Sequence, residues 1–419
     1  MAARVDVDLT GIRQLLGGSL LFARPPVEGD VLQLSSPADG APSGWDPLPA
    51  PVAWWHVFVL PFQGSRETTV EPSSRIRRVH TAAPGFTRRR RGRGFTYLDE
   101  QGRPIRDAHV VERIRILTIP PAWTDVWISP APLGHLQASG TDAAGRKQYL
   151  YHERWRRWRD REKFHKVRDF ARSLPALRRQ VEHDLSDEGL TRERVLACAV
   201  RLLDLGFFRI GSESYAARNG SFGLATMRKE HVKVTDDEVL FDYTAKGGKR
   251  RVQGIADPDV KDVLRRLKGR RNGGSELLAY ATSEGWKDVR SLDINDYIKD
   301  AARGPFSAKD FRTWHGTVLA AVALATADDV GPSLTARKRG VARAIRQVAE
   351  DLGNTPAVAR ASYVDPRVLD RYLEGETIRL TLQDVPPEEL SDPSLQQRVE
   401  RAVLDLIDSA PHSDERRAA

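Results

Sequence analysis

The sequence lacks the features of several common protein classes. Its 419 residues include one cysteine, Cys198, which excludes a disulfide framework and a cysteine-based zinc site. No uninterrupted apolar run approaches the roughly 18 residues that span a bilayer. The N-terminus makes a poor signal peptide because Asp6 and Asp8 lie where positive charge is wanted. We therefore expect a protein of a reducing, cytoplasmic compartment.

Several catalytic motifs are also missing. There is no G-x-x-x-x-G-K-[ST] phosphate loop, no H-E-x-x-H zinc motif and no G-x-S-x-G nucleophile elbow. Acidic residues do not cluster at the spacings that hold Mg²⁺ or Ca²⁺. The sequence therefore predicts no metal site and no cofactor.

The positive charge is concentrated in one segment. The formal net charge is +9, yet residues 1–70 carry −3 and residues 384–419 carry −5. Residues 146–179 hold thirteen Lys and Arg against four Asp and Glu, with Trp155 and Trp158 interleaved. Such a concentration points to a polyanionic partner.

The pattern of apolar residues and turn signals divides the chain into four parts. Residues 1–75 are Pro-rich and predict a loosely ordered or separately packed extension. Residues 76–160 predict a small β-rich domain with one helix near Asp107–Leu117, and residues 161–380 a mostly helical domain. Residues 381–419 form an acidic tail with one short amphipathic helix. The basic run Arg88–Arg93 is either a solvated segment or a phosphate clamp.

Local signals place the main elements of the helical part. Thr191 is a good N-cap for a helix that Gly206 can end, and Ser307 is a candidate N-cap for a second helix. Residues 231–255 alternate as strands, with a hairpin turn at residues 245–249.

Polar side chains stand out at the ends of these elements. Arg209 follows the Gly206 helix stop, Lys246 lies at the hairpin tip and Arg312 lies near the start of the helix that Ser307 can cap. Asn354 and Tyr363 lie nine residues apart in one segment. Taken singly, each has an ordinary structural explanation: a surface ion pair, an exposed turn residue or a packed tyrosine.

Taken together and in order, these residues belong to a set of six blocks. The blocks are GFTYLDEQGRPIRD, RIRILTIPPAWTDVWISPAPLGHLQASGTDAAGRKQYLYH, LLDLGFFRIGSESYAARNGSFGLATMRKEHV, AKGGKR, FSAKDFRTWHGT and LGNTPAVARASYVDPRVL. They resemble the type IB DNA topoisomerases, specifically the short poxvirus-like form found in bacteria. The resemblance covers about residues 85–375. It implies an α+β protein: a small β-rich clamp domain, then a mostly helical catalytic domain with a three-stranded β element.

The resemblance also implies roles for the polar residues. Tyr363 matches the nucleophile, Arg209 and Arg312 match the arginines that bind the scissile phosphate, and Lys246 matches the hairpin lysine. Asn354 stands where the poxvirus enzymes have histidine. Because asparagine donates hydrogen bonds but does not titrate, we expect Asn354 to stabilise charge rather than to transfer a proton.

Residues 145–151, GRKQYLY, resemble the segment with which the family contacts DNA. The DNA contacts that we expect are Arg146, Lys147, Gln148, Tyr149, Tyr151 and Lys309. In a strand, Tyr149 and Tyr151 project from one face and Gln148 from the other. The alternative is that both tyrosines are ordinary packed strand residues.

The predicted function is relaxation of supercoiled DNA without ATP or metal, through single-strand cleavage, a 3′-phosphotyrosyl intermediate and religation. The expected partner is double-stranded DNA, held by a monomer that clamps the duplex in the cytoplasmic nucleoid. Two alternatives stay open: a tyrosine recombinase, which uses a similar set of residues, and a non-catalytic DNA-binding protein.

Overall fold

The computed structural model describes residues 75–327, 333–383 and 393–409. The extension expected over residues 1–75 therefore lies outside the described residues, apart from Arg75. The chain divides into two compact units, with the division between Arg161 and Glu162.

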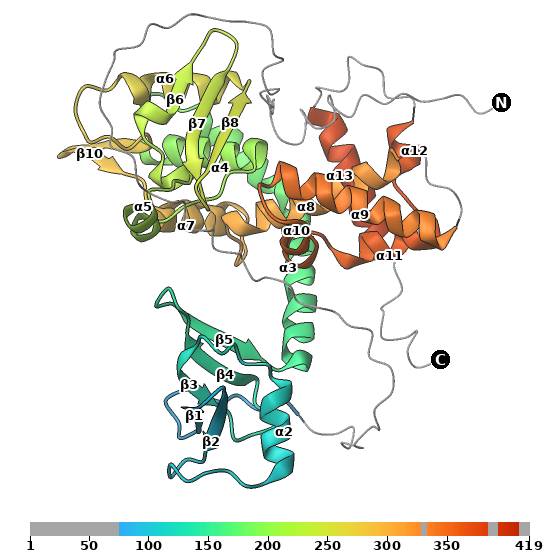
Figure 1. The fold of residues 1–419 in the computed structure, drawn as a ribbon. Helices are drawn as coiled ribbons and strands as arrows, with labels where there is room; N and C mark the ends of the chain where they lie inside the picture. The colour runs from blue at the N-terminus through green and yellow to red at the C-terminus, as the bar shows by residue number, and fades with distance from the viewer. Residues whose placement is uncertain (1–74, 328–332, 384–392, 410–419) are drawn as a thin grey trace, which may run out of the picture. The chain divides into compact units, whose positions relative to one another are not determined.

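The N-terminal unit is a five-stranded antiparallel sheet with one helix against it (Figure 1). The strands are β1 (Phe86–Arg91), β2 (Gly94–Leu98), β3 (Thr124–Ile128), β4 (Leu136–Thr141) and β5 (Lys147–Tyr151), in the order β2-β1-β3-β4-β5, and the helix is α2 (Ala108–Ile116). Asp107 caps α2, because its carboxylate accepts from the backbone of His109 and Val110. Ile114 of α2 packs on Val126 and Ile128, which forms the core of this unit.

The basic run of residues 88–93 forms the β1–β2 hairpin. Arg88 is anchored there, since its guanidinium donates to the carbonyls of Ile119, Pro120 and Trp123. The arginines at positions 89, 90, 91 and 93 are exposed. Whether the run is a solvated segment or a phosphate clamp, it is part of a structured hairpin.

A helix of 33 residues, α3 (Glu153–Leu185), begins in the N-terminal unit and continues into the second unit. It contains most of the basic segment. Beyond Phe164 it buries one apolar face, including Phe170, Leu174 and Leu177, against the second unit's core. No helix in the described ranges has the length and hydropathy of a membrane span.

The second unit is mostly helical. Its helices are α4 (Arg192–Gly206), α5 (Glu213–Asn219), α6 (Pro258–Gly269), α7 (Ser291–Ala301), α8 (Ala308–Ala325), α9 (Leu334–Asp351), α10 (Pro356–Ser362), α11 (Pro366–Glu374), α12 (Arg379–Leu382) and α13 (Pro393–Asp408). Its strands are β6 (Val232–Val234), β7 (Val239–Ala245) and β8 (Lys249–Ile255) in one antiparallel sheet, and β9 (Ala279–Thr282) with β10 (Gly285–Asp288) in another. This confirms the predicted α+β fold with a three-stranded element in the helical part.

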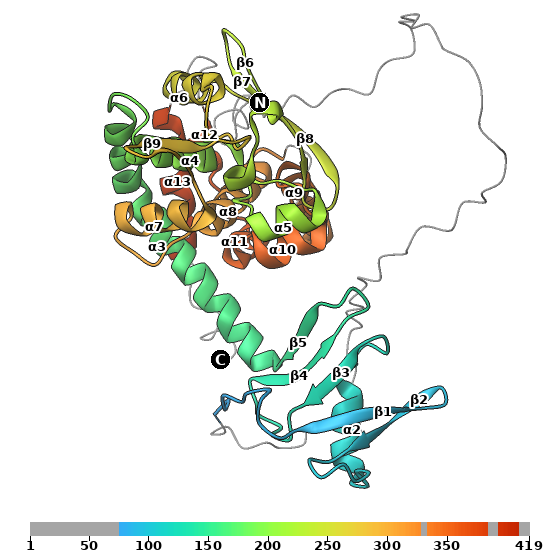
Figure 2. The ribbon, with the colours of Figure 1, turned by 90° about the vertical axis from the view of Figure 1, so that its left-hand side faces the viewer.

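Helix α8 is the centre of this unit. It packs against α4, α7, α9 and α11, and Figure 2 shows these helices around it. Nearly all of its residues are buried, including polar ones such as Asp310, Arg312 and His315, so the helix is enclosed on every side. Ser307 precedes it as predicted, and the Asp310 carboxylate accepts from the Ser307 backbone N–H at 2.8 Å. Arg312 is therefore held on a helix that the core of the unit surrounds.

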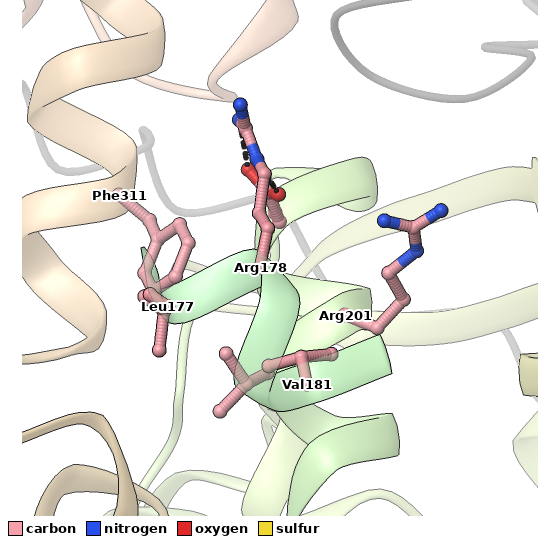
Figure 3. A pocket seen from close by; sticks show the side chains of 7 residues that line it. Leu177, Arg178, Val181, Arg201 and Phe311 are labelled. Carbon is pink, nitrogen blue, oxygen red and sulfur yellow. Dashed lines mark hydrogen bonds and ion pairs between the residues drawn. The ribbon is translucent and has the colours of Figure 1, made fainter. Parts of the chain in front are cut away.

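A buried ion network joins α3, α4 and α13. Arg178 donates to Asp204 at 2.7 Å and to Glu400 at 2.7 Å, and all three side chains are nearly inaccessible to solvent. Figure 3 shows Arg178 beside the small cavity that Leu177 and Phe311 help to line. The amphipathic helix predicted in the C-terminal segment is α13, which buries Leu395, Val399, Val403 and Ile407 in the same core as α8.

Candidate active site

Four of the five predicted catalytic residues lie together in the second unit. Arg209 donates to the side-chain oxygen of Asn354 at 2.6 Å. The Arg312 guanidinium carbon lies 5.3 Å from the centroid of the Tyr363 ring. The charge of Arg209 and the hydroxyl of Tyr363 both act on the pKa of Arg312. Residues spread over 155 positions of sequence thus meet at one place.

Arg209 is positioned by the way the chain leaves α4. Gly206 is the last helical residue, but the left-handed residue is Phe207 (φ 52°). Gly206 is needed for packing instead, because a Cβ there would lie 2.3 Å from the Phe208 ring. The Arg209 carbonyl then accepts from the Leu224 N–H at 2.8 Å, which ties the loop to the next segment.

Arg312 is 4% exposed and donates to two backbone carbonyls, Phe207 O and Leu352 O. Burial is the main cause that lowers its pKa to about 10; the charge of Arg209 acts in the same direction, and Tyr363 opposes both. At that value the guanidinium stays charged at neutral pH. Its Nε is buried without a hydrogen-bond partner.

Asn354 follows the end of α9 through Gly353, whose φ of 60° favours glycine. The Asn354 side-chain oxygen accepts from Arg209, which leaves its Nδ2 as the second polar group of the amide. That Nδ2 is also buried without a partner. Buried donors of this kind are uncommon, because leaving one unsatisfied costs about 1–3 kcal/mol.

Tyr363 ends helix α10 and lies against α8. Its backbone carbonyl accepts from the Thr317 hydroxyl at 3.3 Å, and the same hydroxyl accepts from the Asp365 N–H at 3.1 Å. Gly316 permits the close approach, because a Cβ there would lie 2.7 Å from the Tyr363 carbonyl oxygen. The helix that carries Arg312 therefore also sets the position of Tyr363.

Lys246 is on the β7–β8 turn, where Gly247 and Gly248 have positive φ. It is exposed, and its Nζ lies 5.9 Å from the centroid of the Tyr215 ring. Within the described residues, no hydrogen bond or ion pair joins Lys246 to the other four.

A third arginine, Arg251 on β8, was missed by sequence reasoning. It donates to the Asp351 carbonyl at 3.1 Å, near Gly353. The charges of Arg209 and Arg251 lower the pKa of Arg312. The alternation of RRVQGI indicates a strand, but nothing local shows which of its two arginines faces inward.

The expected DNA-contact residues of the N-terminal unit lie on β5, except Arg146, which directly precedes it. Tyr149 and Tyr151 are 47% and 41% exposed and share one face, as predicted. Gln148 lies on the opposite face and donates to Asp142 at 2.8 Å. Hydrogen bonds from Arg146 lower the pKa of Asp142 to about 2. Lys147 is exposed, and in the second unit Lys309 is exposed in the first turn of α8.

Comparison with known proteins gives matches to both units. Residues 94–142 match the N-terminal domain of bacterial DNA topoisomerase IB, and residues 152–377 match the catalytic core of eukaryotic DNA topoisomerase I. DNA topoisomerase 1B of Acanthamoeba polyphaga mimivirus is 31% identical over 295 residues, which are 69% of this chain and 87% of that protein. DNA topoisomerase I of Monkeypox virus and DNA topoisomerase 1B of Vaccinia virus (strain Copenhagen) are each 22% identical over 275 residues, 64% of this chain and 83% of theirs.

Proposed function

The chain belongs to the type IB DNA topoisomerases, and from that premise we propose that Tyr363 is the nucleophile with which it relaxes supercoiled DNA. Its substrate is double-stranded DNA. The observation that carries the proposal is the pair of buried donors without partners, Arg312 Nε and Asn354 Nδ2, in the group that includes Tyr363. A phosphate would supply the acceptors that they lack.

In the proposed reaction, Tyr363 Oη attacks the phosphorus of a DNA phosphodiester. A bond forms between Oη and phosphorus, and the bond from phosphorus to the 5′-oxygen breaks. The phenol loses its proton and the leaving 5′-oxygen gains one. One phosphoester replaces another, so the step needs no ATP. Rotation of the free end removes supercoils, and the 5′-hydroxyl then attacks the phosphotyrosyl bond in reverse.

Arg209, Arg312 and Asn354 stabilise the charge that gathers on the non-bridging oxygens. A hydrogen bond to a charged group contributes about 1.5–3 kcal/mol, and the effects within one site are not additive. These donors are already held by backbone carbonyls and by one another, so little reorganisation is needed when the transition state forms. Asn354 acts only as a donor, because its amide does not titrate.

Lys246 is the proposed proton donor to the 5′-oxygen. A lysine on a two-glycine turn can reach a bound strand, since the turn is exposed. A general acid must come within hydrogen-bond distance of its acceptor, and such contacts often form only when substrate is bound. The 5.9 Å contact with Tyr215 would then be exchanged for a contact with DNA.

We also propose that the protein acts as a monomer in the cytoplasmic nucleoid, with the β5 face as a second contact to the same duplex. Supporting this are the exposed Tyr149 and Tyr151 beside the exposed cations Arg146 and Lys147. Aromatic and cationic side chains on one exposed strand are typical of a nucleic-acid surface.

The deciding experiment is plasmid relaxation in EDTA without ATP, followed by mapping of the covalent adduct. We expect relaxation by the wild-type protein, an adduct on Tyr363, and DNA binding without adduct formation by Tyr363→Phe. An adduct that survives in Tyr363→Phe would exclude Tyr363 as the nucleophile. Exchange of strands between paired sites would indicate a recombinase, and DNA binding without any wild-type adduct a non-catalytic protein.

A further inference from the structure

Arg251 lies between the two segments that carry Arg209 and Asn354. It belongs to β8, opposite Tyr243 of β7 in the strand register. The positive charges of Arg251, Arg312 and Arg209 all lower the pKa of Tyr243, which burial raises. Arg251 is therefore close to the catalytic cations, although it comes from the sheet rather than from the helices.

The hydrogen bonds of Arg251 connect the end of α4 to the end of α9. Its Nη2 donates to the carbonyl of Asp351, the last residue of α9, at 3.1 Å. Its Nε donates to the side-chain oxygen of Gln253 at 2.7 Å. Gln253 is fully buried and donates in turn to the carbonyl of Gly206, the last residue of α4, at 2.9 Å. One continuous chain of hydrogen bonds thus joins the two helix ends.

Each attachment point precedes an active-site residue by the same number of positions in the sequence. Arg209 lies three residues after Gly206, and Asn354 lies three residues after Asp351. Phe207 follows Gly206 and Leu352 follows Asp351, and Arg312 donates to the carbonyls of both, which bridges the two segments. Arg209, which follows in the first segment, donates directly to Gly353 and Asn354 of the second. Three successive arginine bridges therefore hold the same two segments side by side.

We propose that Arg251 is a positioning residue, which sets the separation of Arg209 and Asn354 and so aligns the Asn354 amide with the scissile phosphate. This rests on the proposed function. Gly353 supports the assignment, because a Cβ there would lie 3.3 Å from Arg251 Nη1 and 3.9 Å from Arg209 Nη1. The turn before Asn354 is thus in contact with one guanidinium and close to the other.

The proposal is tested by single-turnover cleavage of a duplex oligonucleotide that traps the covalent adduct. Arg251→Gln should lower the cleavage rate constant about 10- to 100-fold, the loss expected for a misplacement of up to about 1 Å. Its dissociation constant for DNA should change less than about 3-fold, because Arg251 acts through Asn354 and not through DNA affinity. The neighbouring variant Arg250→Gln is the matched control, since Arg250 is exposed and pairs with Asp242.

A double variant separates positioning from a general structural role. If Arg251 acts through Asn354, Arg251→Gln combined with Asn354→Ala should cleave within about 3-fold of the slower single variant. Multiplied losses, or an equal loss in Arg250→Gln, would overturn the proposal. So would a wild-type rate in Arg251→Gln.

If Arg251→Gln does not fold, Arg251→Lys is used to test the same proposal. Lysine keeps the charge but lacks the planar fork that reaches two acceptors, so it should cleave at least 5-fold more slowly than wild type. Wild-type cleavage by this variant would show that charge alone suffices, against the proposal. An adduct on Tyr363 in the wild-type protein is the reference, so its absence would reveal failure of the proposed function itself.

Discussion

Replacing Gly316 by alanine should slow DNA cleavage while leaving the fold nearly as stable. Gly316 lies in the middle of α8, where it faces the backbone of Tyr363. An added Cβ would lie 2.7 Å from the Tyr363 carbonyl oxygen, 3.0 Å from its Cβ and 3.2 Å from the Leu352 side chain. Two of these atoms belong to the proposed nucleophile, so the tyrosine must move.

The distances set the size of the effect. Non-bonded carbon atoms are most stable about 3.5–4.0 Å apart, so Tyr363 would shift by roughly 0.5–0.8 Å. A displacement of about 1 Å at a reacting group can cost 10²-fold in rate, and we expect a loss of about 10- to 100-fold. For stability, alanine favours a helix over glycine by about 1 kcal/mol, against about 1–3 kcal/mol for overpacking. The free energy of unfolding should therefore fall by no more than about 2 kcal/mol.

The assay is single-turnover cleavage at 25 °C together with thermal unfolding of the same variant. Gly269→Ala is the matched control, because Gly269 lies in α6 and a Cβ there would meet no atom within 4 Å. We expect Gly269→Ala to keep the wild-type cleavage rate. The reasoning would be refuted if Gly316→Ala cleaved within 2-fold of wild type, or if Gly269→Ala lost as much.

Four further outcomes are expected. A DNA substrate with a better 5′ leaving group should restore cleavage to Lys246→Ala, and failure to do so would count against a role as acid. Glu400→Gln should lower the free energy of unfolding by about 1.5–3 kcal/mol, measured by urea titration, with cleavage at 25 °C unchanged. Burial alone would raise the pKa of Asp204, but Arg178 holds it well below its usual value, so its contribution to stability is complete above about pH 4 and is lost as pH falls; in urea titrations at several pH values, Asp204→Asn should flatten the fall in stability below pH 4, and an unchanged slope would contradict this. DNA affinity should fall about 10³-fold between 50 and 200 mM salt if six phosphates are neutralised, and a weak salt dependence in a binding titration would contradict the charge argument.

The elements that the sequence predicted well are those with local causes. Thr191 caps α4 and Ser307 precedes α8. Such a cap depends only on the side chain of the capping residue or on that of the residue three positions later, so it can be predicted from local sequence. The β7–β8 hairpin follows from Gly247 and Gly248, which accept positive φ. In contrast, the single helix α3 was not predicted from its basic segment. Its inner face is stabilised by contacts with α8 and α13, which lie far away in the chain.

The candidate active site also contains residues that could be predicted from the sequence and one that could not. The resemblance to a family supplied Arg209, Arg312, Asn354 and Tyr363, and the structure brings all four together. Neither the resemblance nor any local pattern supplied Arg251. Its role depends on three segments that meet only in the folded protein.

Arg178 differs from the proposed catalytic arginines in what neutralises its charge. Arg178 is paired with two carboxylates, so its charge is cancelled inside the core and its effect is on stability. In the described part of the chain, Arg209 and Arg312 form no ion pair with a carboxylate; their acceptors are backbone carbonyls and the Asn354 side-chain oxygen. Such acceptors hold a guanidinium in place without removing its charge. The positive field therefore remains available to a phosphate. A carboxylate that held these arginines in the free protein would instead cancel part of that field and weaken its stabilisation of the transition state.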